Sequence, residues 1–367
     1  MTRDIAIRLR GVTKRWGNHQ VINTMDLDIE RGQLVALLGP SGCGKSTTLR
    51  LIAGLETADT GSVEINCRDV TGAAPSERSL SMVFQSYALF PHLSVAENIS
   101  FGMKVRRVPS REREQRLRQA LAMTNLEEVA KRKPSELSGG QRQRVALARA
   151  IVSGHSICLM DEPLSNLDAK LRHSMRQEIR SLQQRLGMTV VYVTHDQTEA
   201  MGMADKIVLM NASCIAQIGT PAALYEHPVS AFTATFIGSP PMMLFSAEHV
   251  PPSLRPETED RRAAGDYLVG IRPEKFCISE PNSCAMRGTV TGLEFQGAES
   301  FIYVTLHGGN PVIIRTADQR NLQIGQEIGL SWKHASAHLF DTTSGHRLHA
   351  ASQASTRNAF PPTANIG

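Results

Sequence analysis

Long apolar runs are absent from this sequence of 367 residues. No stretch approaches the roughly 18 consecutive apolar residues that a transmembrane helix needs, so we expect no segment that spans a bilayer. Residues 1–11, MTRDIAIRLRG, alternate charged with single apolar residues, which favours a strand over a signal peptide. The formal net charge of +5 is modest, so it permits an anionic partner without requiring one.

Cysteine is scarce, and its spacing fits no metal site. The six cysteines are scattered along the chain, at positions 43, 67, 158, 214, 277 and 284. Such usage favours a reducing compartment over an oxidising one. Four histidines near the end of the sequence also lack a strong ligand spacing, so we interpret them as surface imidazoles and not as a metal site. They are His334, His338, His346 and His349.

The length exceeds one ordinary core and favours two domains. Residues 1–236 alternate short apolar strands, such as QLVALLG, SICLMDE and TVVYVTHD, with helix-like stretches. This alternation predicts an α/β fold with a largely parallel sheet that is covered on both faces. Residues 5–16 and 21–32 are expected to add antiparallel strands to that sheet. Residues 87–155 are mostly helical and are expected to form a helical subdomain.

The composition changes after residue 236. Residues 246–266 combine three prolines with many charges, which is typical of a linker. Short alternating runs follow, including YLVGIRPEKFCI and SFIYVTLHG, and they predict a small all-β domain. We therefore expect a linker and a C-terminal β domain over residues 237–350. The polar residues 351–367 are expected to form a flexible tail.

A glycine-rich loop, GPSGCGKST, matches the pattern G-x-x-x-x-G-K-[ST] between a strand and a helix. Glycine lets successive backbone N–H groups point inward, and the following helix adds the positive end of its dipole. Lys45 is placed to reach the β- and γ-phosphates of a nucleotide, and Ser46 to bind Mg²⁺. The loop alone does not distinguish ATP from GTP. The residues expected to bind the nucleotide are Gly39, Pro40, Ser41, Gly42, Cys43, Gly44, Lys45, Ser46 and Thr47.

Two carboxylates follow the apolar strand ICLM. Because ligands of α/β sheets bind beyond the carboxyl ends of the strands, Asp161 and Glu162 are expected to point at the nucleotide. Asp161 would then hold Mg²⁺, and Glu162 would take a proton from the attacking water as general base. Paired acids also occur on solvated turns, but the phosphate loop elsewhere in the chain favours the catalytic interpretation.

The segment LSGGQRQRVALARAI places Ser138, Gly139 and Gly140 before a second helix suited to an anion. The two helix starts could serve one nucleotide in one subunit or a site shared between subunits. With LSGGQ, the sequence resembles the ATP-binding subunits of ABC transporters, which are P-loop ATPases that hydrolyse ATP to ADP and phosphate. The resemblance implies a homodimer with each ATP between the phosphate loop of one subunit and the signature of the other.

The same resemblance implies roles for further residues. Gln85 matches a glutamine that contacts Mg²⁺ and water, His195 matches a switch histidine near the γ-phosphate, and Trp16 stands where an aromatic ring stacks on adenine. The catalytic residues implied are Glu162, His195 and Gln85. The Mg²⁺ ligands implied are Ser46, Gln85 and Asp161. The residues implied to contact ATP across the dimer are Ser138, Gly139, Gly140, Gln141 and Asp168.

Residues 1–350 resemble the ATPases of maltose-type importers, which carry an OB-type regulatory domain after the ATPase domain. GIRPE, QIGTP and LYEHP carry that resemblance, and FIGSPPMMLF favours the group that imports carbohydrates or sn-glycerol-3-phosphate. Polyamine, iron(III) and sulfate importers share much of the pattern and remain alternatives. The resemblance implies a peripheral location at the cytoplasmic face of the inner membrane. The partners implied are two membrane permease subunits and, indirectly, an extracytoplasmic solute-binding protein.

A soluble ABC ATPase acting on nucleic acid or ribosomes is the distant alternative. The basic stretch KVRRVPSREREQRLRQ lacks interleaved aromatic residues and carries glutamates, so we interpret it as a solvated helix face and expect no nucleic acid. In the family, residues 86–100 lie where a cytoplasmic helix of the membrane subunit docks, although some of their apolar side chains belong to the core. The docking residues implied are Tyr87, Leu89, Phe90 and Leu93.

Overall fold

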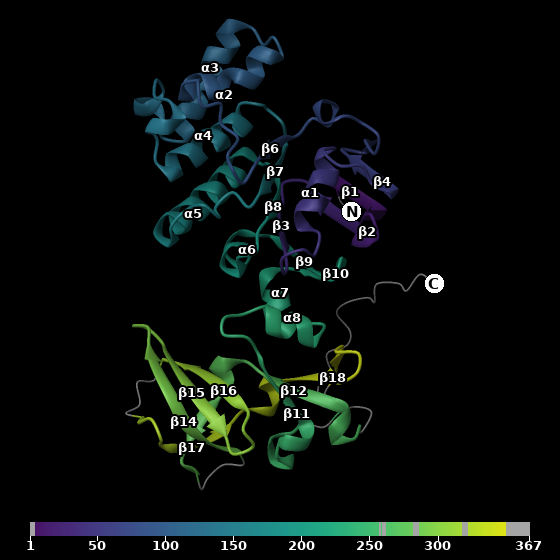
Figure 1. Ribbon diagram of the computed structural model, residues 1–367, viewed down its shortest axis with the longest axis vertical. Helices are drawn as coiled ribbons and strands as arrows, with labels where there is room; N and C mark the ends of the chain where they lie inside the picture. The colour runs from purple at the N-terminus through teal and green to yellow at the C-terminus, as the bar shows by residue number, and fades with distance from the viewer. Residues whose placement is uncertain (1–3, 257, 259–261, 282–285, 318–321, 350–367) are drawn as a thin grey trace. The chain divides into compact units, whose positions relative to one another are not determined.

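The computed structural model describes residues 4–349 except 257, 259–261, 282–285 and 318–321. The chain divides into two compact units, Met1–Ala222 and Ala223–Gly367 (Figure 1). The tail expected at 351–367 lies outside the described residues. None of the described helices is both long enough and apolar enough to cross a membrane.

A six-stranded sheet forms the centre of the first unit. Its order is β10-β9-β3-β8-β7-β6, and only β10 runs antiparallel to its neighbour. Every residue of β3, β7 and β8 is buried, because helices or a second sheet cover both faces. The expected P-loop α/β fold is therefore confirmed. The strands are β3 (Leu34–Leu38), β6 (Ser81–Val83), β7 (Ile157–Asp161), β8 (Thr189–Val193), β9 (Lys206–Asn211) and β10 (Cys214–Gly219).

A separate antiparallel sheet of order β2-β1-β4-β5 packs on helix α1, Lys45–Ala53. The expectation that residues 5–16 and 21–32 extend the parallel sheet is wrong, because these strands pair only within the second sheet. Helix α1 is buried on two sides, and one hydrophobic core joins it to strands of both sheets. The strands are β1 (Ile5–Trp16), β2 (His19–Glu30), β4 (Thr60–Ile65) and β5 (Arg68–Asp69).

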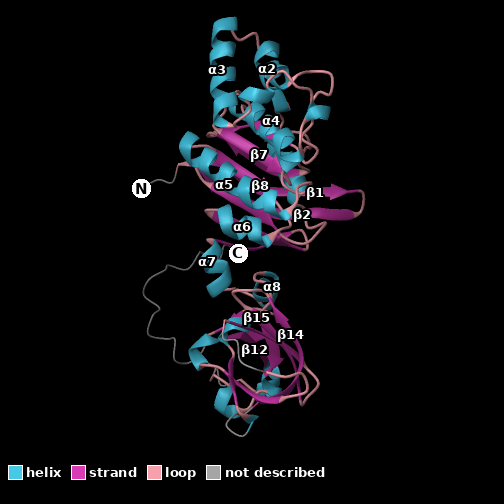
Figure 2. Ribbon diagram, turned by 90° about the vertical axis from the view of Figure 1, so that its left-hand side faces the viewer, coloured by secondary structure: helices cyan, strands magenta, loops and turns pink. Residues whose placement is uncertain are grey.

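Helices α5 and α6 lie side by side on one face of the parallel sheet (Figure 2), where α6 packs against β3. Each begins at an aspartate whose side chain accepts a backbone N–H of the first turn, Asp168 for α5 and Asp196 for α6. Three further helices form a subdomain with its own apolar core, within the region expected to be helical. The helices are α5 (Ala169–Leu186), α6 (Gln197–Met203), α2 (Val95–Val105), α3 (Ser110–Met123) and α4 (Gly139–Ile151).

The second unit contains two antiparallel sheets, of order β11-β12-β18-β19 and β13-β17-β14-β15-β16. This confirms the expected C-terminal β domain. The unit starts before residue 236, because Arg272 donates to the carbonyls of Tyr225, Ala234 and Ile237 and so holds that segment in it. Its elements are α7 (Pro221–Glu226), α8 (Ala231–Phe236), β11 (Met243–Ser246), β12 (Tyr267–Ile271), β13 (Cys277–Ser279), β14 (Met286–Phe295), β15 (Ser300–Leu306), β16 (Pro311–Thr316), β17 (Glu327–Ser331), β18 (Ala337–Asp341) and β19 (Arg347–Leu348).

Candidate functional site

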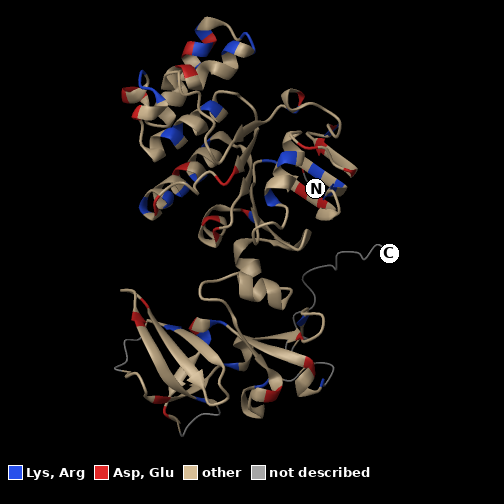
Figure 3. Cartoon of the chain, in the orientation of Figure 1, with Lys and Arg blue, Asp and Glu red and all other residues tan. Residues whose placement is uncertain are grey.

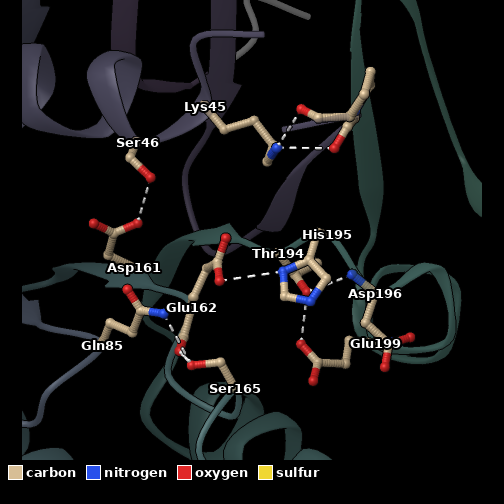
Figure 4. A network of polar contacts seen from close by, with 12 residues as sticks. Lys45, Ser46, Gln85, Asp161, Glu162, Ser165, Thr194, His195, Asp196 and Glu199 are labelled. Carbon is tan, nitrogen blue, oxygen red and sulfur yellow. Dashed lines mark hydrogen bonds and ion pairs between the residues drawn. The ribbon is translucent and has the colours of Figure 1, made fainter. Parts of the chain in front are cut away.

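Four neighbouring strands of the parallel sheet bring the candidate residues to one edge. Strands β3, β8, β7 and β6 lie side by side in that order and point the same way. The loop after β3 leads to Lys45, the loop after β8 carries His195, β7 ends at Asp161, and Gln85 follows β6. Because the carboxyl ends of parallel strands share one edge, residues far apart in the sequence form one site there (Figure 4).

The phosphate loop has the backbone that its glycines permit. Gly42 and Gly44 have φ values of 81° and 102°, a region that side chains disfavour. A Cβ on Gly44 would lie 2.6 Å from the carbonyl oxygen of Val21. No side chain caps the start of α1, so the N–H groups of its first turn stay available to an anion. The loop therefore fits the phosphates of a nucleotide.

Lys45 lies folded against its own loop. Its Nζ donates to the carbonyl oxygens of Gly39 and Pro40, each at 2.8 Å, and the residue is almost fully buried. Its neighbour Cys43 is also buried, and this burial raises the pKa of the Cys43 thiol. A phosphate that enters the loop can therefore replace two carbonyl contacts of the lysine with stronger charge-assisted ones.

Ser46 and Asp161 form the candidate metal site. The hydroxyl of Ser46 donates to Oδ1 of Asp161 at 2.8 Å (Figure 4). A hydroxyl oxygen beside a carboxylate is the hard oxygen donor set that suits Mg²⁺. Gln85 lies near this pair in Figure 4 and bonds to the loop after β7: its Nε2 donates to Ser165 Oγ at 3.3 Å, and its backbone carbonyl accepts from the Asn166 side chain at 3.0 Å.

Glu162 faces His195 across the ends of β7 and β8. Nδ1 of His195 lies 3.2 Å from Oε2 of Glu162, and the imidazole is more than half exposed (Figure 4). Glu162 has a φ of 43°, which is strained for a residue with a side chain, and its N–H is held by the carbonyl of Val193 at 3.1 Å. Such strain concentrates at functional sites, where the surrounding structure holds it in place.

The loop that carries His195 rests on a buried network that the sequence analysis missed. The carboxylate of Glu199 accepts hydrogen bonds from Tyr192 at 2.7 Å and Thr194 at 2.8 Å. Thr194 Oγ1 in turn accepts the N–H of Asp196 at 2.9 Å (Figure 4). Burial raises the pKa of Glu199, and the two hydroxyl donors act in the opposite direction. The spacing of Asp196 and Glu199 suggests a helix cap, so no sequence signal pointed to this inward role.

The signature residues form a helix start of their own. Ser138 caps α4, with its Oγ accepting the N–H of Gln141 and its own N–H donating to the Gln141 side chain at 2.9 Å. A Cβ on Gly140 would come within 3.0 Å of Leu171, so the helix start packs closely on α5. Among the described residues, no hydrogen bond joins residues 137–141 to the phosphate loop of the same chain.

Trp16 ends β1 with 49% of its surface exposed, and Lys14 lies 5.2 Å from the centre of its ring. The ring is thus partly accessible to a flat partner, with the Lys14 cation already near it.

The apolar residues expected at the docking surface differ in burial. Tyr87 is only 5% exposed, and Arg149 donates to the carbonyls of Tyr87 and Ala88. Leu89 packs against the core of the helical subdomain. Phe90 is partly exposed, and its ring centre lies 4.4 Å from that of Phe101, which is also exposed. Leu89, Phe90 and Leu93 are all partly exposed, so Tyr87 is the one of the four predicted docking residues that is buried.

Residues of positive and negative charge are interspersed along the helices of the first unit (Figure 3). That pattern agrees with a solvated helix surface at the basic stretch 104–119.

Comparison with known proteins agrees with this geometry. The family model described as ABC transporter matches residues 22–165, and a TOBE domain model matches residues 269–340. The sn-glycerol-3-phosphate import ATP-binding protein UgpC of Brucella abortus (strain 2308) is 46% identical over 340 residues, which are 91% of this chain and 97% of that protein. The protein of the same name from Rhizobium meliloti (strain 1021) is 45% identical, over 93% of this chain and 99% of that protein.

Solved structures resemble the first unit. One, described as "Dimeric Structure of MJ0796, a Bacterial ABC Transporter Cassette", aligns with a TM-score of 0.53 and 33% identity, over 59% of this chain and 98% of the other. The structure of cbiO1 from Clostridium perfringens, part of an ABC transporter complex, aligns with a TM-score of 0.57 and 25% identity, over 61% of this chain and 92% of the other. From its ATP site and these relatives, this chain belongs to the ATP-hydrolysing subunits of ABC transporters.

Proposed function

We propose that this chain energises the import of sn-glycerol-3-phosphate across the inner membrane, bound to the cytoplasmic face of two permease subunits. One observation supports the ATPase function above all. The phosphate loop, the Ser46–Asp161 pair and the Glu162–His195 pair all lie at the same edge of the parallel sheet. The cargo is supported by relatives at 45–46% identity that are named for import of this compound. A carbohydrate is the next cargo to test.

Binding of ATP starts at the phosphate loop. The N–H groups before and within the first turn of α1 bind the phosphates, and Lys45 leaves the carbonyls of Gly39 and Pro40 to bind them as well. Ser46 and Asp161 would hold Mg²⁺, with Gln85 beside them, and the ion would supply charge neutralisation on the phosphate oxygens. Trp16 stacks on adenine.

Hydrolysis needs a base and a fixed histidine. Glu162 accepts a proton from the attacking water, and His195 lies beside the γ-phosphate, oriented by its contact with Glu162. The hydrogen bonds from Thr194 and Tyr192 to Glu199 keep the His195 loop in place. Placement of these groups lowers the barrier more than any single contact does.

A second copy of the chain completes the site. Ser138, with its helix start, has no hydrogen bond to the phosphate loop of its own chain among the described residues, so it is available to the ATP of the partner subunit. Asp168 adds a second contact across the dimer. A two-fold axis repeats the same pair of surfaces, which gives two equivalent ATP sites.

Uptake of labelled sn-glycerol-3-phosphate tests the proposal. A strain that lacks the gene should lose this uptake, regain it with the wild-type gene, and fail to regain it with Lys45→Ala. Uptake of maltose, spermidine, iron(III) and sulfate serves as the comparison. Loss of one of those activities with normal sn-glycerol-3-phosphate uptake would overturn the cargo but not the motor function.

A further inference from the structure

A turn over residues 85–88 follows strand β6 and carries Gln85 at its start. Two successive residues of this turn, Tyr87 and Ala88, have φ values of 63° and 47°, in the left-handed region that residues with a Cβ disfavour. The N–H of Tyr87 donates to the carbonyl of Phe84 at 2.9 Å and closes the turn. Such a backbone persists only where its surroundings hold it, and it concentrates at functional sites.

Arg149 holds this turn from the far end of α4, the helix that begins after the signature residue Ser138. Its Nη1 donates to the carbonyl of Ala88 at 2.7 Å, and its Nη2 donates to the carbonyl of Tyr87 at 2.9 Å. Because the donors of a guanidinium lie in one rigid plane, the two bonds fix the directions of two successive carbonyls. Arg149 is partly buried and, in the described part of the chain, pairs with no carboxylate. Its charge therefore serves these carbonyls.

The segment after the turn is held by a different side chain. Asn98 of α2 is fully buried, and its Oδ1 accepts the N–H of Phe90 at 2.8 Å. Its Nδ2 donates to the carbonyls of Phe90, Leu93 and Ser94, at 3.0–3.1 Å. These contacts begin only at Phe90, after the strained residues, so they do not replace the contacts of Arg149.

On the other side of the turn, Gln85 belongs to a chain of hydrogen bonds that ends at the general base. Nε2 of Gln85 donates to Ser165 Oγ at 3.3 Å, and that hydroxyl donates to the backbone carbonyl of Glu162 at 3.0 Å (Figure 4). Gln85 is itself exposed, and Ser86 is the single residue between it and Tyr87. A displacement of the turn therefore moves Gln85 and disturbs its contact with the loop of Glu162.

We propose that Arg149 is a positioning residue for ATP hydrolysis: it holds the turn at Tyr87 and Ala88 and so fixes where Gln85 lies beside the candidate metal site. Arg149 is not a catalytic residue, because it acts through the backbone of the turn. The inference rests on the role proposed above for Gln85 beside Mg²⁺.

Hydrogen exchange of the ligand-free chain tests the turn itself, without hydrolysis. Arg149→Met removes both donors and keeps much of the apolar stem, so the peptide over residues 84–90 should exchange about tenfold faster than in the wild type. Arg113→Met is the matched control, since Arg113 of α3 donates to the carbonyl of Val108 in the same subdomain and has no contact with the turn among the described residues. It should leave the exchange of residues 84–90 unchanged. Equal exchange in the wild type and Arg149→Met would overturn the proposal.

ATP hydrolysis tests the consequence for the site. Arg149→Met should lower kcat about tenfold, with the KM for ATP changed less than about threefold, because the phosphate loop is intact. Arg149→Lys keeps the charge but not the planar pair of donors, so its kcat should lie between the two. Arg113→Met should keep the wild-type kcat. A kcat of Arg149→Met equal to that of the control would overturn the proposal.

A double-mutant cycle with Gln85→Ala distinguishes positioning from a merely structural role. If Arg149 acts through Gln85, Arg149→Met should lower kcat less than about twofold further once Gln85 is absent. Two losses that simply multiply would overturn the proposal for Arg149 and leave the proposed function intact. Normal hydrolysis by Gln85→Ala alone would instead overturn the role proposed for Gln85. Thermal unfolding shows whether each variant folds, and Arg149→Lys takes the place of Arg149→Met in all three measurements if the methionine variant does not.

Discussion

Thr194→Val tests whether the buried network below His195 supports the ATPase site. Thr194 is only 2% exposed, donates to Glu199 at 2.8 Å and accepts the N–H of Asp196 at 2.9 Å. Valine has nearly the same shape but neither donates nor accepts. The substitution therefore removes both hydrogen bonds of one side chain without opening a cavity.

The magnitude follows from these two contacts. A hydrogen bond to a charged group contributes about 1.5–3 kcal/mol, and a part-buried N–H left without a partner costs about 1 kcal/mol or more. We expect Thr194→Val to lower the free energy of unfolding of the first unit by about 3 kcal/mol. Thr194→Ser keeps the hydroxyl and loses one methyl group, so it should cost about 1 kcal/mol. The control thus separates hydrogen bonding from packing.

Urea unfolding and ATP hydrolysis are the measurements. Trp16 fluorescence in a Trp332→Phe background reports the first unit alone, because the two tryptophans lie in different units. We expect Thr194→Val to lower kcat for ATP about tenfold through misplacement of His195, with ATP affinity changed less than threefold. Independent substitutions add to within roughly 0.5 kcal/mol. If the free energies of unfolding of the valine and serine variants differ by less than roughly this amount, and both variants hydrolyse ATP at the same rate, the network has no supporting role.

Three further predictions address the other parts of the chain. Glu162→Gln should retain ATP binding and lose at least about 100-fold in hydrolysis, and light scattering with ATP should detect a dimer; a variant that stays monomeric with ATP contradicts the shared site. Phe90→Asp should abolish co-purification with the permease subunits while ATP affinity stays unchanged, and normal assembly would exclude a docking role. The pKa of His338 is lowered from 6.5 to about 4, so the unfolded chain binds the extra proton first as the pH falls. The stability of the second unit should therefore be complete above pH 6.5 and fall by about 3 kcal/mol towards pH 4, followed by Trp332 fluorescence; a flat profile that His338→Gln leaves unchanged would contradict it.

Several parts of the site were predictable from the sequence because they depend on neighbours in the chain. The phosphate loop needs glycine at fixed offsets, and the structure places Gly42 and Gly44 at positive φ. Asp161 and Glu162 follow a buried strand, and the order of strands and helices makes the carboxyl ends of β3 and β7 share one edge. These inferences need only the local residue pattern and the rule that parallel strands place their carboxyl ends at one edge of the sheet.

Other contacts depend on which faces meet in the folded chain. Glu199 was not singled out in the sequence, and it turns inward because Tyr192 and Thr194 of the neighbouring strand end present hydroxyls to it. The folded-back position of Lys45 likewise follows from carbonyls that only the closed loop presents.

The sequence by itself determined the helix and strand periods, the anion-binding loop and the division into an α/β and a β part, since each is set by residues close together in the chain. Only the tertiary structure decided that β1 and β2 form a sheet of their own against α1, that His338 is partly buried and not the surface imidazole expected from the sequence, and that Arg149 reaches the turn after Gln85. The physical reason is that sheet membership and register are chosen by long-range burial of apolar faces, and residues that lie far apart in the sequence acquire a common neighbourhood only when those faces meet.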